Sequence, residues 1–166
     1  MNTFKDRENI LGDLSELPLK YKLFLKAYPW RRIDPVPWEP LKKPLKDNRV
    51  ALVSSAGLVQ PDQKPFDDSI RGGDYSFREI PADVDVAALI DTHRSDLYDH
   101  AGLRQDPNLV FPLDRLREQV GNGRIGSLNQ RHLSFMGSIT APGRLVKKTT
   151  PVAVRKLVED GVDIVL

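Results

Sequence analysis

Cysteine is absent from all 166 residues of this sequence. Its absence excludes a disulfide, a thiolate metal site and a cysteine nucleophile within the chain. Long apolar runs are also missing, and no stretch approaches the roughly 20 residues that a membrane-spanning helix needs. The first residues lack the uninterrupted apolar core of a signal peptide. The sequence therefore predicts a cytoplasmic protein without a membrane segment, in which any thiol or selenol chemistry comes from outside these residues.

An excess of charge of one sign is missing as well. The 25 Lys and Arg side chains nearly balance the 23 Asp and Glu side chains. Basic residues gather modestly between positions 31 and 46, but no stripe of alternating basic and aromatic side chains follows them. Nucleic acid is therefore not an expected partner. The hydrophobic fraction of 40% and the length are ordinary for one globular domain.

Proline and tryptophan set the amino-terminal part of the chain apart. Leu19–Tyr28 has the pattern of a short amphipathic helix, which Pro29 should end. Five prolines between Pro29 and Pro44 exclude a long helix or a central strand there. Trp30 and Trp38 lie in this Pro-rich arm. They either anchor the arm to the body of the protein or contact a partner or a second copy.

The rest of the chain alternates between strand and helix patterns. Its clearest strand is the continuous apolar run at 49–58, which is typical of a strand covered on both faces. We expect further strands at 76–80, in the second half of 84–92, around 134–137 and at 162–166, helices at 113–120 and from 142 or 151 to 160, and a loop at 97–108.

This order favours an α/β fold with a mostly parallel, Rossmann-like sheet flanked by helices. We predict two regions, an amino-terminal helix and Pro-rich arm over 1–47 and an α/β domain over 48–166. The last strand of that domain is expected to be incomplete at its carboxyl end. An unfinished sheet would favour a partner chain or a homo-oligomer.

Side chains suited to acid–base chemistry gather in one loop, in the order Asp91, His93, Asp96, Asp99 and His100. His132 follows farther along the chain. Histidine and carboxylates are the groups that proton transfer or a divalent metal uses, although no HExxH pattern is present. The same residue types commonly cap turns and helices. Structural capping, a substrate or catalytic role and a metal site therefore all remain open.

The clearest strand ends where a ligand usually binds in open α/β sheets, at the carboxyl end of a strand. Ser54 and Ser55 end the clearest strand, but no GxSxG pattern surrounds them, so we expect hydrogen-bonding residues rather than nucleophiles. Gly137 follows a predicted strand and would permit another backbone to approach closely.

Seven segments, taken together, resemble those of a known family. They are Val50–Gly57, Gly73–Pro81, His93–His100, Asn108–Leu116, Gly123–Leu128, Ser134–Gly137 and Glu159–Asp163. Their order and spacing resemble the selenoprotein B family of the glycine, betaine, sarcosine and D-proline reductases. The resemblance extends over roughly residues 48 to 166.

The resemblance implies reductive cleavage of a C–N bond in a small amine or amino acid. In the better-known complexes of this family, a pyruvoyl group of a partner subunit holds the substrate as a Schiff base. A selenocysteine of the B subunit then attacks carbon and displaces the amine. A nearby cysteine and an external thiol system restore the site.

The family's selenocysteine or cysteine motif follows the strand that corresponds to Val162–Leu166. A selenocysteine or cysteine is therefore expected beyond residue 166, and no catalytic nucleophile is assigned within the chain. His93, Asp99 and His100 match a polar segment of the family and are the site residues that the resemblance implies. No cofactor is expected within the chain itself.

Three functions remain open at this point. The first is a component B subunit of an amino-acid or amine reductase, with other reductase subunits and a small amine or amino acid as partners. The second is a non-catalytic binding or scaffolding homologue that uses the tryptophan-bearing arm. The third is a metal-dependent enzyme built on His93, Asp99, His100 and His132.

Overall fold

The structure of the protein, a computed structural model, describes residue 15 and residues 17–30 and 32–166. The chain divides into two compact units, Met1–Pro40 and Leu41–Leu166. Within the described ranges, none of the helices is long and apolar enough to cross a membrane. The boundary predicted between residues 47 and 48 stays a prediction.

Among the described residues of the first unit there is one helix, α1 (Leu19–Ala27), as the sequence predicts. Tyr28 ends this helix with extended backbone, because Pro29 disfavours the helical conformation of the residue before it. The indole Nε1–H of Trp30 donates to the carbonyl of Leu25 at 3.0 Å. Residues 32–40 form neither helix nor strand. None of the described residues in this unit is buried.

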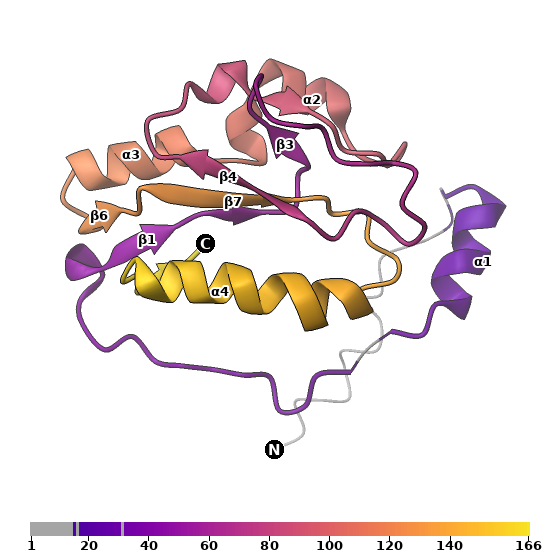
Figure 1. The fold of residues 1–166 in the computed structure, drawn as a ribbon, viewed down its shortest axis with the longest axis horizontal. Coiled ribbons are helices and arrows are strands. Elements are labelled where there is room, and N and C mark those ends of the chain that lie inside the picture. The colour runs from indigo at the N-terminus through magenta and orange to yellow at the C-terminus, as the bar shows by residue number, and fades with distance from the viewer. Residues whose placement is uncertain (1–14, 16, 31) are drawn as a thin grey trace. The chain divides into compact units, whose positions relative to one another are not determined.

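The second unit is built on short strands that hydrogen bond into two sheets of three strands (Figure 1). These strands are β1 (Arg49–Ala51), β2 (Val53–Ser54), β4 (Phe77–Pro81), β6 (Ser127–Leu128), β7 (Arg131–Phe135) and β8 (Ile164–Val165). β1 pairs in parallel with β6 and β8, while β2 pairs in parallel with β7. β4 pairs with β7 in the antiparallel sense. A separate antiparallel pair joins β3 (Leu58–Val59) to β5 (Ile90–Asp91).

The two sheets are continuous through one residue between β1 and β2. The carbonyl of Leu52 accepts a hydrogen bond from the N–H of Leu133 at 2.8 Å. The N–H of Leu52 donates instead to the Nδ1 atom of the His132 side chain at 2.9 Å. The strand that the sequence predicts at 49–58 is therefore present but divided, because an imidazole replaces a backbone acceptor in its middle.

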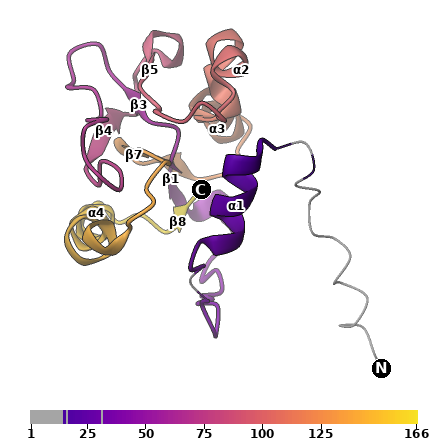
Figure 2. The ribbon, with the colours of Figure 1, turned by 90° about the vertical axis from the view of Figure 1, so that its right-hand side faces the viewer.

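Helices cover both faces of this sheet, as Figures 1 and 2 show. On one face lies α4 (Thr150–Glu159), whose Ala153 and Leu157 pack with Ala51 and Leu133. On the other face lie α2 (His100–Gln105), α3 (Leu113–Gly121) and the larger core around Leu52. Consecutive residues of β1 and the segment after it thus point into different cores, which explains their continuous apolar sequence.

Charged side chains tie α4 to the sheet near the amino ends of the parallel strands. Arg131 Nε and Nη2 donate to the two carboxylate oxygens of Asp160 at 2.7 and 2.9 Å. Arg131 Nη1 also contacts Glu79 at 3.1 Å, and Lys156 contacts the same carboxylate at 2.9 Å. A bidentate arginine pair of this kind fixes geometry as well as adding energy. It sets the end of α4 relative to β7 and β4.

The α/β class predicted from the sequence is confirmed, and so are helices at α1, α3 and α4 and strands at β4, β7 and β8. The prediction of a loop over 97–108 is wrong, because α2 forms within it. The six residues of α2 include Gly102 and are too few to show a helical repeat of apolar residues, so the sequence pattern does not reveal this helix. Short helical turns at Leu45–Asp47, Val86–Ala88 and Pro107–Leu109 and a π-helical turn at Leu145–Thr149 complete the unit.

Candidate functional site

The carboxyl ends of β2 and β7 meet the loop that follows β5. The N–H of Gly57 donates to the carbonyl of Phe135 at 2.8 Å. The carbonyl of Gly57 accepts from the N–H and the hydroxyl of Thr92, at 3.1 and 2.6 Å. Gly57 has a φ of +69°, and a Cβ there would lie 3.0 Å from the backbone of His93. Only glycine fits this junction without strain.

His93 lies close to Gly137, the glycine after β7 at which the sequence predicts a close backbone approach. A Cβ added to Gly137 would lie 2.5 Å from the carbonyl oxygen of Ser55 and 3.2 Å from Nε2 of His93. The predicted close approach at Gly137 is therefore confirmed. Three chain segments converge here because two glycines, Gly57 and Gly137, leave room for them.

The hydrogen bonds of His93 define its tautomer. The N–H of Ser95 donates to Nδ1 of His93 at 3.3 Å, so the ring proton resides on Nε2. Burial lowers the pKa of His93 below its usual value. The side chain is therefore a neutral donor whose Nε2 lies beside Gly137.

His100 has the opposite protonation state. Its Nδ1 lies 2.5 Å from a carboxylate oxygen of Asp91, and its Nε2 lies 3.1 Å from the carbonyl oxygen of Ser95. Both partners can only accept, so both ring nitrogens must donate. The hydrogen bond to Asp91 raises the pKa of His100 accordingly. Asp91 also accepts from the N–H of His93 at 2.9 Å and so connects the two histidines.

Tyr98 separates the two imidazoles and was not identified from the sequence. Its ring stacks on His93, with centroids 4.1 Å apart and an interplanar angle of 30°. It meets His100 edge-on at 5.3 Å and 77°. The hydroxyl is buried and has no hydrogen-bond partner among the described residues, and burial raises the pKa of Tyr98 to about 12. A single aromatic residue between polar neighbours carries no sequence signal for this role.

The other predicted residues lie apart from this cluster or serve the fold. Asp99 caps α2, since its carboxylate accepts from the N–H of Gly102 at 2.9 Å. Asp96 is exposed. His132 is fully buried in β7, where burial lowers its pKa to about 4.

The structure thus brings together His93 and His100, with Asp99 one position before His100. In the described part of the chain, no three His, Asp or Glu side chains are placed to hold a metal ion.

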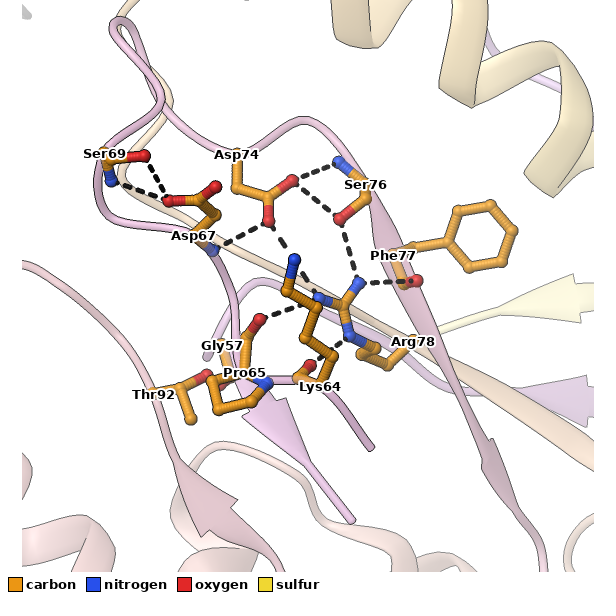
Figure 3. A network of polar contacts seen from close by, with 10 residues as sticks. All are labelled: Gly57, Lys64, Pro65, Asp67, Ser69, Asp74, Ser76, Phe77, Arg78 and Thr92. Atoms are coloured by element: carbon orange, nitrogen blue, oxygen red, sulfur yellow. Dashed lines mark hydrogen bonds and ion pairs between the residues drawn. The ribbon is translucent and has the colours of Figure 1, made fainter. Parts of the chain in front are cut away.

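A polar network holds the neighbouring loop in place (Figure 3). Asp74 is buried and accepts from the N–H of Asp67 at 2.9 Å and from the N–H and hydroxyl of Ser76 at 2.8 and 2.6 Å. Arg78 donates to the carbonyls of Lys64 and Pro65 at 2.8 and 3.1 Å. Because every one of these partners lies within residues 64–78, the network fixes the shape of this loop beside the site.

A cavity of about 530 Å³ opens at the same end of the sheet, on the side of α4. Its walls are mainly apolar and come from the strand ends, from α4 and from the segment after β7. Gly137, which lies beside Nε2 of His93, also lines it, and so does Ser55, whose carbonyl oxygen lies close to Gly137. Ser54 lines it too, but its hydroxyl donates to the carbonyl of Val110 at 2.7 Å. The expectation that Ser54 forms a hydrogen bond at the strand end is confirmed.

Comparison with known proteins identifies the family of this chain. Residues 17–166 match the family described as glycine/sarcosine/betaine reductase selenoprotein B. The chain belongs to this selenoprotein B family. The match begins at residue 17. The sequence that this chain shares with the family therefore includes helix α1 and the segment after it as well as residues 48–166.

Several curated relatives are similar over most of the chain. The D-proline reductase subunit gamma of Acetoanaerobium sticklandii is 38% identical over 135 residues, which are 81% of this chain and 54% of that protein. The sarcosine reductase complex component B subunit beta of Peptoclostridium acidaminophilum is 34% identical over 86% of this chain and 33% of that protein. A glycine reductase complex component B subunit gamma from Carboxydothermus hydrogenoformans is 29% identical over 93% and 35%, respectively.

The chain therefore spans about a third to a half of the length of these relatives. No solved structure matches it with statistical significance.

Proposed function

We propose that this protein is a component B-like subunit of an amino-acid or amine reductase that cleaves a C–N bond reductively. The observation that carries the proposal is the family match over residues 17–166. The names of the relatives support it, because they are subunits of D-proline, sarcosine and glycine reductases. The proposal includes a cytoplasmic location and a Rossmann-like core in the whole subunit, to which the parallel strands of residues 41–166 contribute.

The proposed reaction needs a redox residue, and these 166 residues contain no cysteine. We assign that role to a selenocysteine or cysteine outside them. Its electron pair forms a bond to the substrate carbon, and the C–N bond breaks with its electron pair moving to nitrogen, which takes a proton. A thiol then attacks the selenium or sulfur, the bond from that atom to carbon breaks with its electron pair moving to carbon, and the carbon takes a proton. An external dithiol reduces the resulting selenium–sulfur or disulfide bond. The net change converts one C–N bond and one dithiol into C–H, N–H and a disulfide.

His93 and His100 are our proposed site residues for this reaction. They lie at the carboxyl ends of β2 and β7, where ligands usually bind in open α/β sheets. One is a neutral donor and the other a charged imidazolium, and such a pair can orient a substrate and supply a proton. Asp99 is proposed to act through α2, because its cap positions the helix that begins with His100.

The experiment that tests the proposal uses the natively expressed protein with whatever subunits accompany it. Intact mass and selenium content are measured on the same sample, together with dithiol-dependent release of amine from glycine, sarcosine and betaine and ring opening of D-proline. A mass above 18.7 kDa with selenium or cysteine, and turnover of one substrate, is the expected result. A mass of 18.7 kDa without selenium and without turnover would contradict it and favour a scaffolding role.

A further inference from the structure

One exposed turn of the chain has an asparagine that is followed directly by glycine. α3 ends at Gly121, and Asn122 and Gly123 form the turn that leads out of it. All three residues are exposed. In an Asn–Gly pair the backbone nitrogen of the glycine can attack the side-chain amide of the asparagine, because glycine has no Cβ to block the approach. This turn therefore has the chemistry that deamidation needs.

Hydrogen bonds at the end of α3 oppose this attack. The N–H of Asn122 donates to the carbonyl of Glu118, and the N–H of Gly123 donates to the carbonyl of Val120, both at 2.9 Å. The attacking atom is the nitrogen of Gly123. Its hydrogen bond to Val120 therefore has to open before the reaction can begin.

Little else holds the turn closed. A Cβ added to Gly121 or to Gly123 would have nothing within 4 Å, so no described residue packs against these two positions. The next buried residue along the chain is Ile125. Opening of residues 121–124 therefore breaks a few exposed hydrogen bonds and no core contact. Helix ends of this kind open locally far more often than the whole protein unfolds.

The other asparagines among the described residues are less suited to this reaction. Asn48 and Asn129 are buried. The side-chain amide of Asn108 donates to the carboxylate of Asp114 at 2.9 Å, and the next residue is a leucine. Only Asn122 is followed by glycine in the sequence.

The pair Asp160–Gly161 illustrates why the sequence alone is not sufficient. It follows α4 as Asn122–Gly123 follows α3, and it could form the same ring with loss of water. However, Arg131 holds both carboxylate oxygens of Asp160, at 2.7 and 2.9 Å, and this pairing lowers the pKa of Asp160. An ionised carboxylate does not release an oxygen as a leaving group. We therefore expect no reaction at Asp160.

We propose that Asn122 is a site of spontaneous deamidation that reacts when the last turn of α3 unwinds. The nitrogen of Gly123 forms a bond to Cγ of Asn122, the bond from Cγ to the side-chain nitrogen breaks, and ammonia leaves with the proton that Gly123 gives up. Water then adds to either carbonyl carbon of the five-membered ring. The bond from that carbon to the Gly123 nitrogen breaks, the nitrogen takes a proton, and the product is aspartate or isoaspartate. The proposal is independent of the proposed function.

The product changes the charge at the end of α3. Either product has a carboxylate at the carboxyl end of the helix, where the helix dipole disfavours an anion. Glu118 already places a carboxylate in this last turn, where it pairs with Arg115 at 2.9 Å. The turn should therefore fray after the reaction, while the buried Leu113 and Leu116 keep the rest of α3 in place.

The test follows the native protein during incubation in warm, mildly alkaline buffer. Peptide mapping by mass spectrometry measures conversion at each asparagine, and an isoaspartate-specific methyltransferase detects the second product. Conversion at Asn122 is expected to be at least about tenfold faster than at Asn108, with no isoaspartate at Asp160. No conversion at Asn122, or equal rates at Asn122 and Asn108, would overturn the proposal.

Gly121→Ala tests whether the end of α3 controls the reaction. It leaves the Asn–Gly pair unchanged and has open space for its methyl group. Because alanine favours a helix over glycine, deamidation in the folded protein should slow about two- to fivefold. The urea-unfolded chains should react at the same rate with and without the substitution. Gly143→Ala, at an equally uncrowded glycine outside α3, is the matched control. Equal rates in the folded wild type and Gly121→Ala would contradict control by the helix end.

Asn122→Asp reproduces the charge of one product. Amide hydrogen exchange in the last turn of α3 should be about two- to fivefold faster in this variant than in the wild type. Asn122→Gln keeps the side chain neutral and should exchange at the wild-type rate. Equal exchange in the two variants would contradict the proposed effect of deamidation on α3.

Discussion

The imidazole of His132 occupies a position in the sheet that a backbone carbonyl would normally fill. It is fully buried and accepts the N–H of Leu52 through Nδ1, so it must be neutral for the strand to remain intact. Burial accordingly lowers its pKa from 6.5 to about 4. This structural role has no local sequence pattern, because the partner of His132 is 80 residues away in the chain, and His132 is therefore a candidate metal ligand from the sequence alone.

This arrangement predicts an acid-sensitive stability. Between pH 6.5 and 4 the unfolded chain binds a proton on His132 and the folded chain does not, so the free energy of unfolding falls as pH falls through that window. The loss from this group is on the order of 3 kcal/mol at its low-pH limit, and none is expected above about pH 7. Urea unfolding at pH 7.5 and pH 5 measures it.

His132→Leu provides the control for that measurement. The variant is less stable at pH 7.5 by about 1–3 kcal/mol, because the N–H of Leu52 loses its acceptor. Its stability should depend less on pH than that of the wild type. An equal pH dependence in the two proteins would show that His132 is not the titrating group.

Gly137 allows a second test at the scale of one atom. Gly137→Ala places a methyl group 2.5 Å from the carbonyl oxygen of Ser55, which is backbone and cannot rotate away. We expect a loss of about 1–3 kcal/mol in stability and a changed NMR signal for His93.

Gly143→Ala is the matched control, since nothing lies within 4 Å of the methyl group that it would add. Its stability should stay within about 0.5 kcal/mol of the wild type, as is usual for surface substitutions. Thermal unfolding of the two variants side by side decides the matter, and similar melting temperatures would contradict the close contact at Gly137.

Among the elements, α2 best distinguishes a structural from a chemical role. It has only six residues, and its first residue is His100. Asp99→Ala removes the cap on Gly102 and should destabilise this helix by about 0.5–2 kcal/mol, whereas Asp99→Asn, which can still accept, should retain most of the stability. Amide hydrogen exchange in residues 100–105 provides the measurement.

Asp96→Ala is the control for the cap, because Asp96 is an exposed residue of the same loop. If Asp99→Asn abolished the proposed reductase activity while leaving exchange in α2 unchanged, Asp99 would have a direct chemical role instead of a structural one.

The elements also show what the sequence could and could not predict. α3 begins after Pro112 and repeats apolar residues at 113, 116 and 120, so its pattern was sufficient. β2 was expected because its apolar run faces cores on both sides, and β7 was expected around residues 134–137, which follow His132. The convergence of His93, Gly57 and Gly137 was not predictable, since it depends on contacts between segments 36 to 80 residues apart. Only the polar composition of the loop over residues 91–100 indicated where the candidate site would form.

For the whole molecule, the described residues before Asn48 contribute nothing to the buried cores, which consist of residues from Val50 to Leu157. A chain lacking residues 1–40 should therefore fold, with a melting temperature within about 4 °C of the full chain, or about 1 kcal/mol. Circular dichroism and thermal unfolding test this prediction. A deletion that prevented folding would show that the first unit supplies core contacts.

The ion-pair network of Arg131, Asp160, Glu79 and Lys156 lies near the amino ends of the parallel strands, whereas His93, Gly57 and Gly137 lie at their carboxyl ends. The consequence concerns evolution and engineering. Substitutions that adjust heat tolerance at the first end need not disturb the arrangement of His93, Gly57 and Gly137 at the second, so the usual trade-off between stability and a functional site is relaxed along the length of the sheet. Related chains from organisms that live at different temperatures could thus vary this network while they keep the candidate site.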